Sequence, residues 1–161
     1  MNTVTITQEN AFKAYSIADD NGKEFLSALL GETPKAPNIK ERIKTFEDAC
    51  EALGIKPEDV LHSAHSSYLT RDIEAINAFT KLTIIARALN ESWEPDWTND
   101  NQYKYYPWFN MESGSGLSFD VYVCWRSYST VGSRLCFKSR ELAEYAGKQF
   151  ISIYTEMFIL K

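Results

Sequence analysis

Apolar residues in the first half of the chain recur at the three- and four-residue spacing of amphipathic helices. Thr7 is placed to cap a first helical stretch, which ends at Gly31. Thr45 and Asp48 have the spacing of a capping box, and Gly54 closes the helix that they start. A longer helix, apolar over a wide arc, is expected from about residue 72 to residue 90. Residues 1–92 are therefore predicted to be mainly helical.

After residue 92 the spacing changes from helical to alternating, which is typical of half-buried strands. Strands are predicted at residues 103–110, 117–126 and 134–137, with a glycine-containing hairpin loop between the first two. In the second strand the side chains expected to point towards the core are Leu117, Phe119, Val121, Val123 and Trp125. Because Pro107 lacks an N–H group, the first strand is expected at an edge and the second in the centre.

A last helix, capped by Ser139, is predicted to close the chain. The order of elements indicates an α+β fold with N-terminal helices, a three-stranded antiparallel meander and a C-terminal helix packed on the sheet. The 161 residues fit one domain, with a mainly helical part over 1–92 and the sheet plus closing helix over 93–161.

The composition indicates a cytoplasmic protein. The first residues lack the pattern of a signal peptide, and no apolar stretch approaches the roughly 20 residues that cross a bilayer, so no membrane association is expected. Three cysteines without metal-type spacing favour free thiols in a reducing compartment. His62 and His65 form the one H-x-x-H pair, without a committed third ligand. No cofactor and no metal are therefore predicted.

The sequence nominates no catalytic residue, which favours a role without catalysis. Patterns of a phosphate-binding loop or a nucleophile elbow are absent. Residues 41–61 have a helix–turn–helix cadence, but Glu58 and Asp59 would repel the phosphates of a duplex. Two packed helices are the better interpretation of that segment. A pocket beside residues 93–97 leaves an enzyme as a more distant hypothesis.

Aromatic and basic residues of the predicted sheet give the candidate binding site. Seven of the 17 residues from 93 to 109 are aromatic, and the net charge of −5 is carried mostly by the first half. The strand face opposite Val121 carries Tyr122, Arg126, Arg134 and Lys138, and one choice of parity at Pro107 adds further residues. The full set of candidates is Trp97, Lys104, Tyr106, Trp108, Tyr122, Arg126, Arg134 and Lys138. The alternative is that most of these rings are core, with Trp97, Tyr106 and Trp108 as the exceptions.

Three stretches, TKLTIIARALNESWEPDW, QYKYYPWF and VGSRLCFKSRELAEYAGKQF, resemble a family of small uncharacterised proteins from gut anaerobes and their prophages or mobile elements. The resemblance is most specific over residues 80–155. It implies a bacterial cytoplasmic setting and an origin in a mobile element. The family has no established activity, so the resemblance implies no site residue.

Two functional hypotheses follow from these patterns. The first is a protein-interaction or self-associating accessory module, whose surface would be rich in Tyr, Trp and Arg. The second is a protein that binds single-stranded nucleic acid or a phosphorylated small molecule, since flat rings stack on bases and basic groups neutralise phosphates. In the second hypothesis the aromatic and basic residues share one exposed sheet face.

Overall fold

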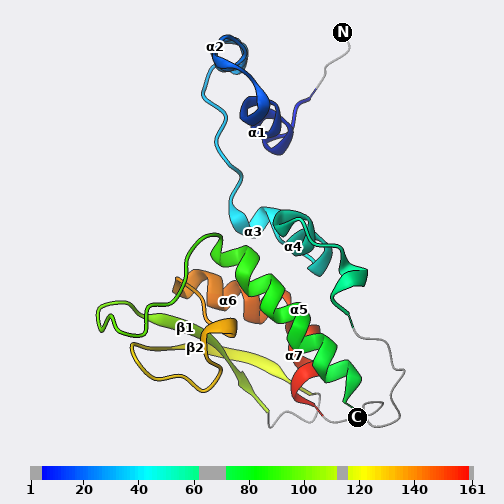
Figure 1. Cartoon of the computed structure of the whole chain (residues 1–161), viewed down its shortest axis with the longest axis vertical. Helices are drawn as coiled ribbons and strands as arrows, with labels where there is room; N and C mark the ends of the chain where they lie inside the picture. Colours follow the sequence, from blue (N-terminus) through cyan, green and yellow to red (C-terminus); the bar gives the residue numbers. More distant parts are fainter. Residues whose placement is uncertain (1–4, 62–71, 112–115, 160–161) are drawn as a thin grey trace. The chain divides into compact units, whose positions relative to one another are not determined.

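The computed structural model describes residues 5–61, 72–111 and 116–159 (Figure 1). The chain divides into two compact units, residues 1–42 and residues 43–161. The first unit contains three helices, α1 (Gln8–Ile17), α2 (Asp20–Leu30) and α3 (Ile39–Arg42). Thr7 caps α1 and Gly31 ends α2 in the left-handed conformation, as the sequence predicts. Neither α1 nor α2 contains a buried residue.

The helical core of the second unit is built around one long helix, α5 (Ile73–Asn90). It packs against α4 (Phe46–Leu53), which precedes it, and against α6 (Arg140–Gln149) and α7 (Ile151–Phe158), which follow the strands. The capping box of α4 and the Ser139 cap of α6 are both present, which confirms these two predicted helix starts. Pro57 opens a short 3-10 turn, η1 (Pro57–Asp59). The predicted closing helix is in fact two helices that meet at Phe150.

The sheet of the second unit is a two-stranded antiparallel hairpin of β1 (Lys104–Asn110) and β2 (Ser118–Trp125). The α+β class is therefore confirmed. The predicted third strand is instead a 3-10 turn, η2 (Ser133–Leu135), followed by a single bridge between Tyr105 and Phe137. This bridge adjoins β1, so the prediction that residues 117–126 form the central strand is wrong.

Backbone directions explain why a strand that contains Pro107 lies between β2 and the bridge. The N–H and C=O groups of Tyr105 both bond to Phe137, at 3.1 and 2.9 Å, and therefore point away from β2. Residues two apart in a strand have the same direction, so the nitrogen of Pro107 also faces away from β2. The bridge ends before Pro107, so its missing N–H costs no ladder hydrogen bond.

A β-bulge reverses part of the predicted alternation in β2. Trp108 pairs with Val121, but the next pair is Phe109 with Phe119, which leaves Asp120 as an extra residue. Phe119 therefore lies on the opposite side of the hairpin from Val121, Val123 and Trp125. The prediction that all of these side chains point towards the core is wrong, since Val121 is 43% and Trp125 is 55% exposed.

Helix α6 covers the other side of the hairpin, as Figure 1 shows. Gly147 makes this close packing possible, because a Cβ atom there would lie 2.8 Å from Cβ of Pro107 and would overlap the ring of Phe119. Helix α7 extends the cover through the ring of Tyr154, whose centroid lies 4.6 Å from that of Phe109. The hairpin thus has one covered side and one side without a helix.

Candidate functional site

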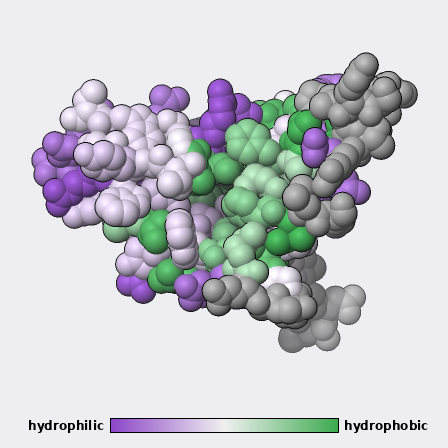
Figure 2. Space-filling model, turned by 90° about the horizontal axis from the view of Figure 1, so that it is seen from below, coloured by the Kyte–Doolittle hydropathy of each residue, from purple (hydrophilic) through white to green (hydrophobic). Residues whose placement is uncertain are grey.

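The side of the hairpin that α6 does not cover exposes apolar and aromatic side chains. Trp108 is 49% exposed, and it lies directly across the ladder from Val121. Trp125 lies on the same side, because residues two and four positions apart in a strand share a face. Figure 2 shows the molecule from below, where hydrophobic and weakly hydrophilic surface occupies the centre and strongly hydrophilic groups lie at the margin. We call Trp108, Val121 and Trp125 the open sheet face.

Beside the open sheet face, strand β2 has an edge without a hydrogen-bonded neighbour. The backbone groups of β2 that bond to β1 belong to Val121, Val123 and Trp125. Because these groups alternate in direction along a strand, those of Tyr122 and Cys124 point outwards. Among the described residues, no strand pairs with β2 other than β1. The outward N–H and C=O groups form no backbone hydrogen bond with any described residue, so they can pair with a further strand.

Lys104 and Tyr106 lie on the same side of the hairpin, across the ladder from Trp125 and Val123, but both are buried. Lys104 is fully buried, and its Nζ donates hydrogen bonds to the carbonyl oxygens of Asp96 and Gln102. The ring of Trp97 lies over this ammonium group, 5.2 Å from Nζ to the ring centroid. Lys104 therefore holds the loop that precedes β1 and is not available to a ligand, whereas Trp97 is half-buried beside it.

Tyr106 is also buried, although it lies next to Trp108 on the same face of β1. Its side chain is 4% exposed, and within the described part of the chain its hydroxyl has no hydrogen-bond partner of normal geometry. Burial raises the pKa of the Tyr106 phenol, and the side chain of Ser129 partly opposes this shift. A buried phenol that stays neutral in this way belongs to the core and cannot stack on a base.

The remaining aromatic and basic candidates lie apart from the open sheet face. Tyr122 lies on the covered side, where the guanidinium of Arg140 sits 4.8 Å from its ring centroid. Arg126 donates a hydrogen bond of 2.7 Å to Tyr103 Oη, and Lys138 forms an ion pair of 2.7 Å with Glu91. The structure therefore does not bring the sequence candidates together on one aromatic and basic surface.

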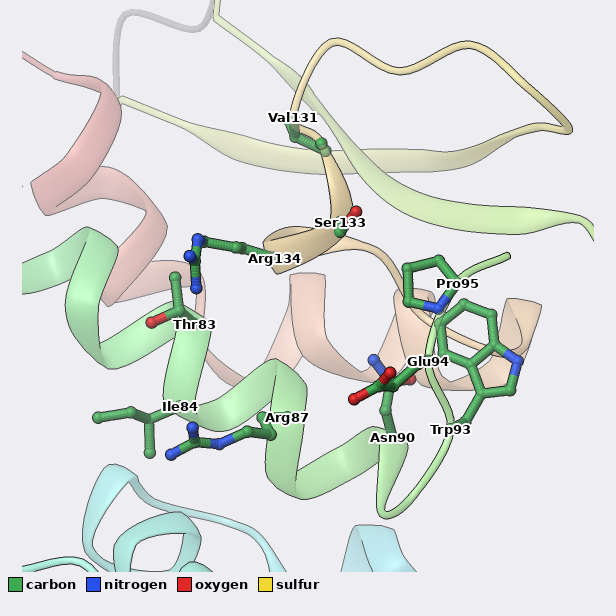
Figure 3. Close-up of a pocket in the computed structure, with 11 residues that line it drawn as sticks. Thr83, Ile84, Arg87, Asn90, Trp93, Glu94, Pro95, Val131, Ser133 and Arg134 are labelled. Carbon is green, nitrogen blue, oxygen red and sulfur yellow. The ribbon is translucent and has the colours of Figure 1, made fainter. Parts of the chain in front are cut away.

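Arg134 instead lines a cleft of about 720 Å³ at the end of α5 (Figure 3). The opposite wall carries Arg87 from α5, and the loop after α5 contributes Trp93, Glu94 and Pro95. Both guanidinium groups are exposed, and in the described part of the chain neither forms an ion pair or a hydrogen bond. Two unpaired cations and one carboxylate leave the cleft with a local positive charge.

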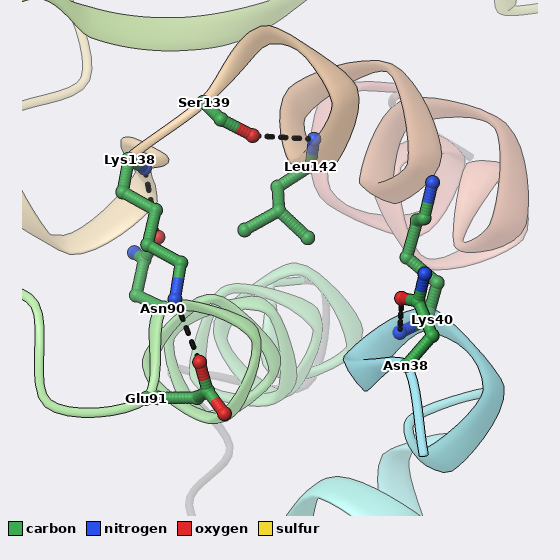
Figure 4. A network of polar contacts seen from close by, with 7 residues as sticks. All are labelled: Asn38, Lys40, Asn90, Glu91, Lys138, Ser139 and Leu142. Atoms are coloured by element: carbon green, nitrogen blue, oxygen red, sulfur yellow. Dashed lines mark hydrogen bonds and ion pairs between the residues drawn. The ribbon is translucent and has the colours of Figure 1, made fainter. Parts of the chain in front are cut away.

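Hydrogen bonds between distant segments fix the walls of this cleft. Asn90, which is 6% exposed, donates through Nδ2 to the carbonyl oxygen of Cys136 at 2.7 Å and accepts from the backbone N–H of Lys138 at 2.9 Å (Figure 4). Trp97 Nε1 donates to Ser133 Oγ at 2.7 Å, which ties the loop before β1 to η2. The cleft is thus held between α5 and the segment from Ser133 to Lys138.

Sequence patterns pointed to a pocket beside residues 93–97 but not to its charge. The sequence does not mark Arg87 as a site residue, because an exposed arginine between the core positions of an amphipathic helix is an ordinary feature. Its partner across the cleft, Arg134, lies 47 positions later in the sequence. Only the packing of η2 on α5 brings the two together. No local pattern carries that information.

The described residues form neither a metal-binding cluster nor a membrane-spanning helix. Within residues 5–61, 72–111 and 116–159, no three His, Cys, Asp or Glu side chains are grouped as metal ligands would be. His62 and His65 lie outside these ranges. None of the described helices combines the length and the apolar character needed to cross a membrane. All three cysteines are free thiols, and Cys50 and Cys136 are buried.

Comparisons of the chain with protein-family models, with curated protein sequences and with solved structures found no match. The candidate sites therefore rest on the contacts of this chain alone. They are two: the open sheet face with the adjoining edge of β2, and the cleft between Arg87 and Arg134.

Proposed function

We propose that the protein acts as a self-associating interaction module in which β2 of one copy pairs with β2 of a second copy. The observation that carries this proposal is the free edge of β2 beside the exposed Trp108, Val121 and Trp125. Pairing along this edge would join two hairpins into one four-stranded sheet. It would also place the open faces of both copies side by side.

The sequence of β2 lacks the devices that normally protect an edge strand from pairing. Proteins block such edges with proline, lysine, inward-pointing charges or a covering segment. Strand β2, SFDVYVCW, has no proline and no lysine, and Asp120 is its one charged residue. The bulge at Asp120 lies near the start of the strand, so the regular stretch from Val121 to Trp125 is left to pair.

Charge complementarity favours one register for the second copy. Tyr122 and Cys124 carry the outward-pointing backbone groups, so they form the hydrogen-bonded pair of an antiparallel arrangement. With Tyr122 opposite Cys124 of the second copy, Val123 meets its own counterpart on the two-fold axis. Asp120 then lies opposite Arg126 of the second copy, and no like charges face each other. The same register sets Val121 opposite Trp125, which buries apolar surface of both copies.

A site-specific disulfide tests this register. In a Cys124→Ser background, Val123→Cys places two thiols across the axis in a non-hydrogen-bonded pair, where Cα atoms are about 4.5 Å apart and a disulfide can form. Mild oxidation with copper phenanthroline should therefore give a covalent dimer on a non-reducing gel.

Val121→Cys in the same background is the matched control, because it changes the same residue type on the same face of the same strand. Its two copies would be offset by four residues, or about 13 Å along the strand, which no disulfide spans. Equal cross-linking of both variants, or none of Val123→Cys, would exclude the proposed pairing.

A further inference from the structure

The cleft between Arg87 and Arg134 has two chemically different ends (Figure 3). At one end the guanidinium of Arg134 lies beside Thr83, and the guanidinium of Arg87 lies further along the wall formed by α5, beside Ile84. At the other end lie the indole of Trp93 and the ring of Pro95, and Glu94 and Asn90 lie between the ends. This arrangement differs from a uniformly solvated surface, because cations and flat apolar groups are segregated along one cavity.

The basic end is suited to an anion with several acceptor oxygens. Arginine presents up to five N–H donors in a planar fork that matches phosphate and carboxylate groups. The Thr83 hydroxyl donates to the carbonyl oxygen of Thr80 at 2.8 Å, which orients it within helix α5. Because neither arginine is neutralised by a described carboxylate, an anion there would not have to displace an existing ion pair.

The aromatic end is suited to a flat ring. Trp93 and Pro95 are half-buried, so part of each ring faces the cleft rather than the core. Glu94 offers a carboxylate that accepts hydrogen bonds from hydroxyl or amino groups, and Asn90 keeps one amide hydrogen beyond its bond to Cys136. A volume of about 720 Å³ lies within the range of sites that hold small organic ligands.

We propose that this cleft binds a small phosphorylated molecule that carries an aromatic ring, the chemistry of a mononucleotide. The phosphate binds between Arg87 and Arg134, and the ring lies against Trp93. The sugar hydroxyl or amino groups of the ligand face Glu94. This site is separate from the edge of β2, so it does not depend on self-association.

The proposal is tested by isothermal titration calorimetry of the full chain with the four common nucleoside monophosphates, the matching nucleosides and inorganic phosphate. At least one nucleotide should bind about tenfold or more tightly than both its nucleoside and inorganic phosphate, since both ends of the cleft contribute. Affinity should fall as salt rises, because the interaction is ionic. Binding of none of the nucleotides, or equal binding of nucleotide and nucleoside, would overturn the proposal. So would inorganic phosphate that binds as tightly as the nucleotides.

Three variants assign the binding to this cleft. Arg87→Gln and Arg134→Gln should each weaken nucleotide binding about tenfold or more, as expected for a lost hydrogen bond to a charged group. Arg126→Gln is the matched control, because it removes an exposed arginine that bonds to Tyr103 outside the cleft. The exposed position of both cleft arginines means that the variants should fold, which circular dichroism checks. Unchanged affinity in either cleft variant, or an equal loss in Arg126→Gln, would overturn the assignment.

Discussion

Lys104 is a charged residue with no described carboxylate partner and no exposed surface. Two backbone carbonyl oxygens and the face of Trp97 take the place of water around its ammonium group. The buried ammonium group stabilises the loop before β1 only because both hydrogen bonds and the contact with Trp97 are formed together. Loss of the ammonium would leave the two part-buried carbonyl oxygens without this donor, which costs more than an average hydrogen bond contributes.

We therefore expect Lys104→Met to lower the free energy of unfolding by about 1–3 kcal/mol for each acceptor that remains buried and unpaired. Chemical denaturation monitored by tryptophan fluorescence measures the change. Lys56→Met is the control, because Lys56 is exposed and has no described side-chain partner. It should change stability by about 0.5 kcal/mol or less. Similar losses in both variants would show that Lys104 is not a structural cation.

The buried thiol of Cys136 should make the stability of the fold depend on pH. Burial raises the pKa of its thiol from 9.0 to about 11. The thiol therefore ionises near pH 9 in the unfolded chain but stays neutral in the folded one. Stability from this group is fully present below pH 9 and is lost as pH rises from 9 to 11. Two pKa units at about 1.4 kcal/mol each correspond to a loss of about 2–3 kcal/mol.

Cys136→Ala isolates this effect from other groups that ionise in the same range, such as the tyrosines. The difference in unfolding free energy between the wild-type protein and Cys136→Ala should shrink between pH 9 and pH 11. Urea denaturation at pH 8, 9, 10 and 11 measures it. A difference that stays constant across this range would mean that the thiol is not held neutral by the fold.

At the level of the elements, the contact between α6 and the hairpin depends on one residue without a side chain. Gly147→Ala would place a methyl group against Phe119 and Pro107, both on the covered side. Overpacking of this kind costs about 1–3 kcal/mol, more than the roughly 1 kcal/mol that alanine gains over glycine in a helix. Thermal unfolding should therefore show a lower melting temperature. The control is Ser152→Ala, at an exposed position of α7, which should leave the melting temperature nearly unchanged. A Gly147→Ala protein of wild-type stability would contradict the tight contact between α6 and the hairpin.

Several helix ends were predictable from the sequence because their signals are local, whereas the breaks between α1 and α2 and between α6 and α7 were not. Thr45 with Asp48, Gly54 and Ser139 each act within one turn of the helix that they begin or end. The antiparallel pairing of β1 with β2 was also predicted; residues 112–115 of the predicted loop lie outside the described residues. The side on which each β2 residue lies was not predictable, because the alternation from Leu117 to Trp125 continues without a break through the bulge at Asp120.

The composition of the candidate site was harder to predict than the elements. A lysine among aromatic residues suggests an exposed binding face, yet Lys104 is buried by contacts with a loop that the strand pattern does not describe. Trp125 lies in the apolar row of its strand, yet it is exposed because α6 covers the other side of the hairpin. Both outcomes depend on which segments pack on the sheet, and that is decided far away in sequence.

For the whole molecule, we predict a symmetric dimer through the edge of β2. Its apolar open sheet face and unprotected edge are the features that a single copy leaves exposed. The fraction of dimer should rise with protein concentration, because two separate chains must associate to form it. Removal of one outward-pointing N–H group of β2 should weaken the dimer without disturbing the hydrogen bonds between β1 and β2.

Sedimentation equilibrium of the wild-type protein and of Cys124→Pro tests this claim most directly. The proline removes an outward-pointing N–H group and leaves the hydrogen bonds to β1, whereas Cys124→Val keeps that group and serves as the control. We predict a reversible monomer–dimer equilibrium for the wild-type protein and Cys124→Val, and a monomer for Cys124→Pro with unchanged circular dichroism. A wild-type protein that is monomeric at every concentration, or a Cys124→Pro protein that dimerises equally well, would contradict pairing through the edge of β2.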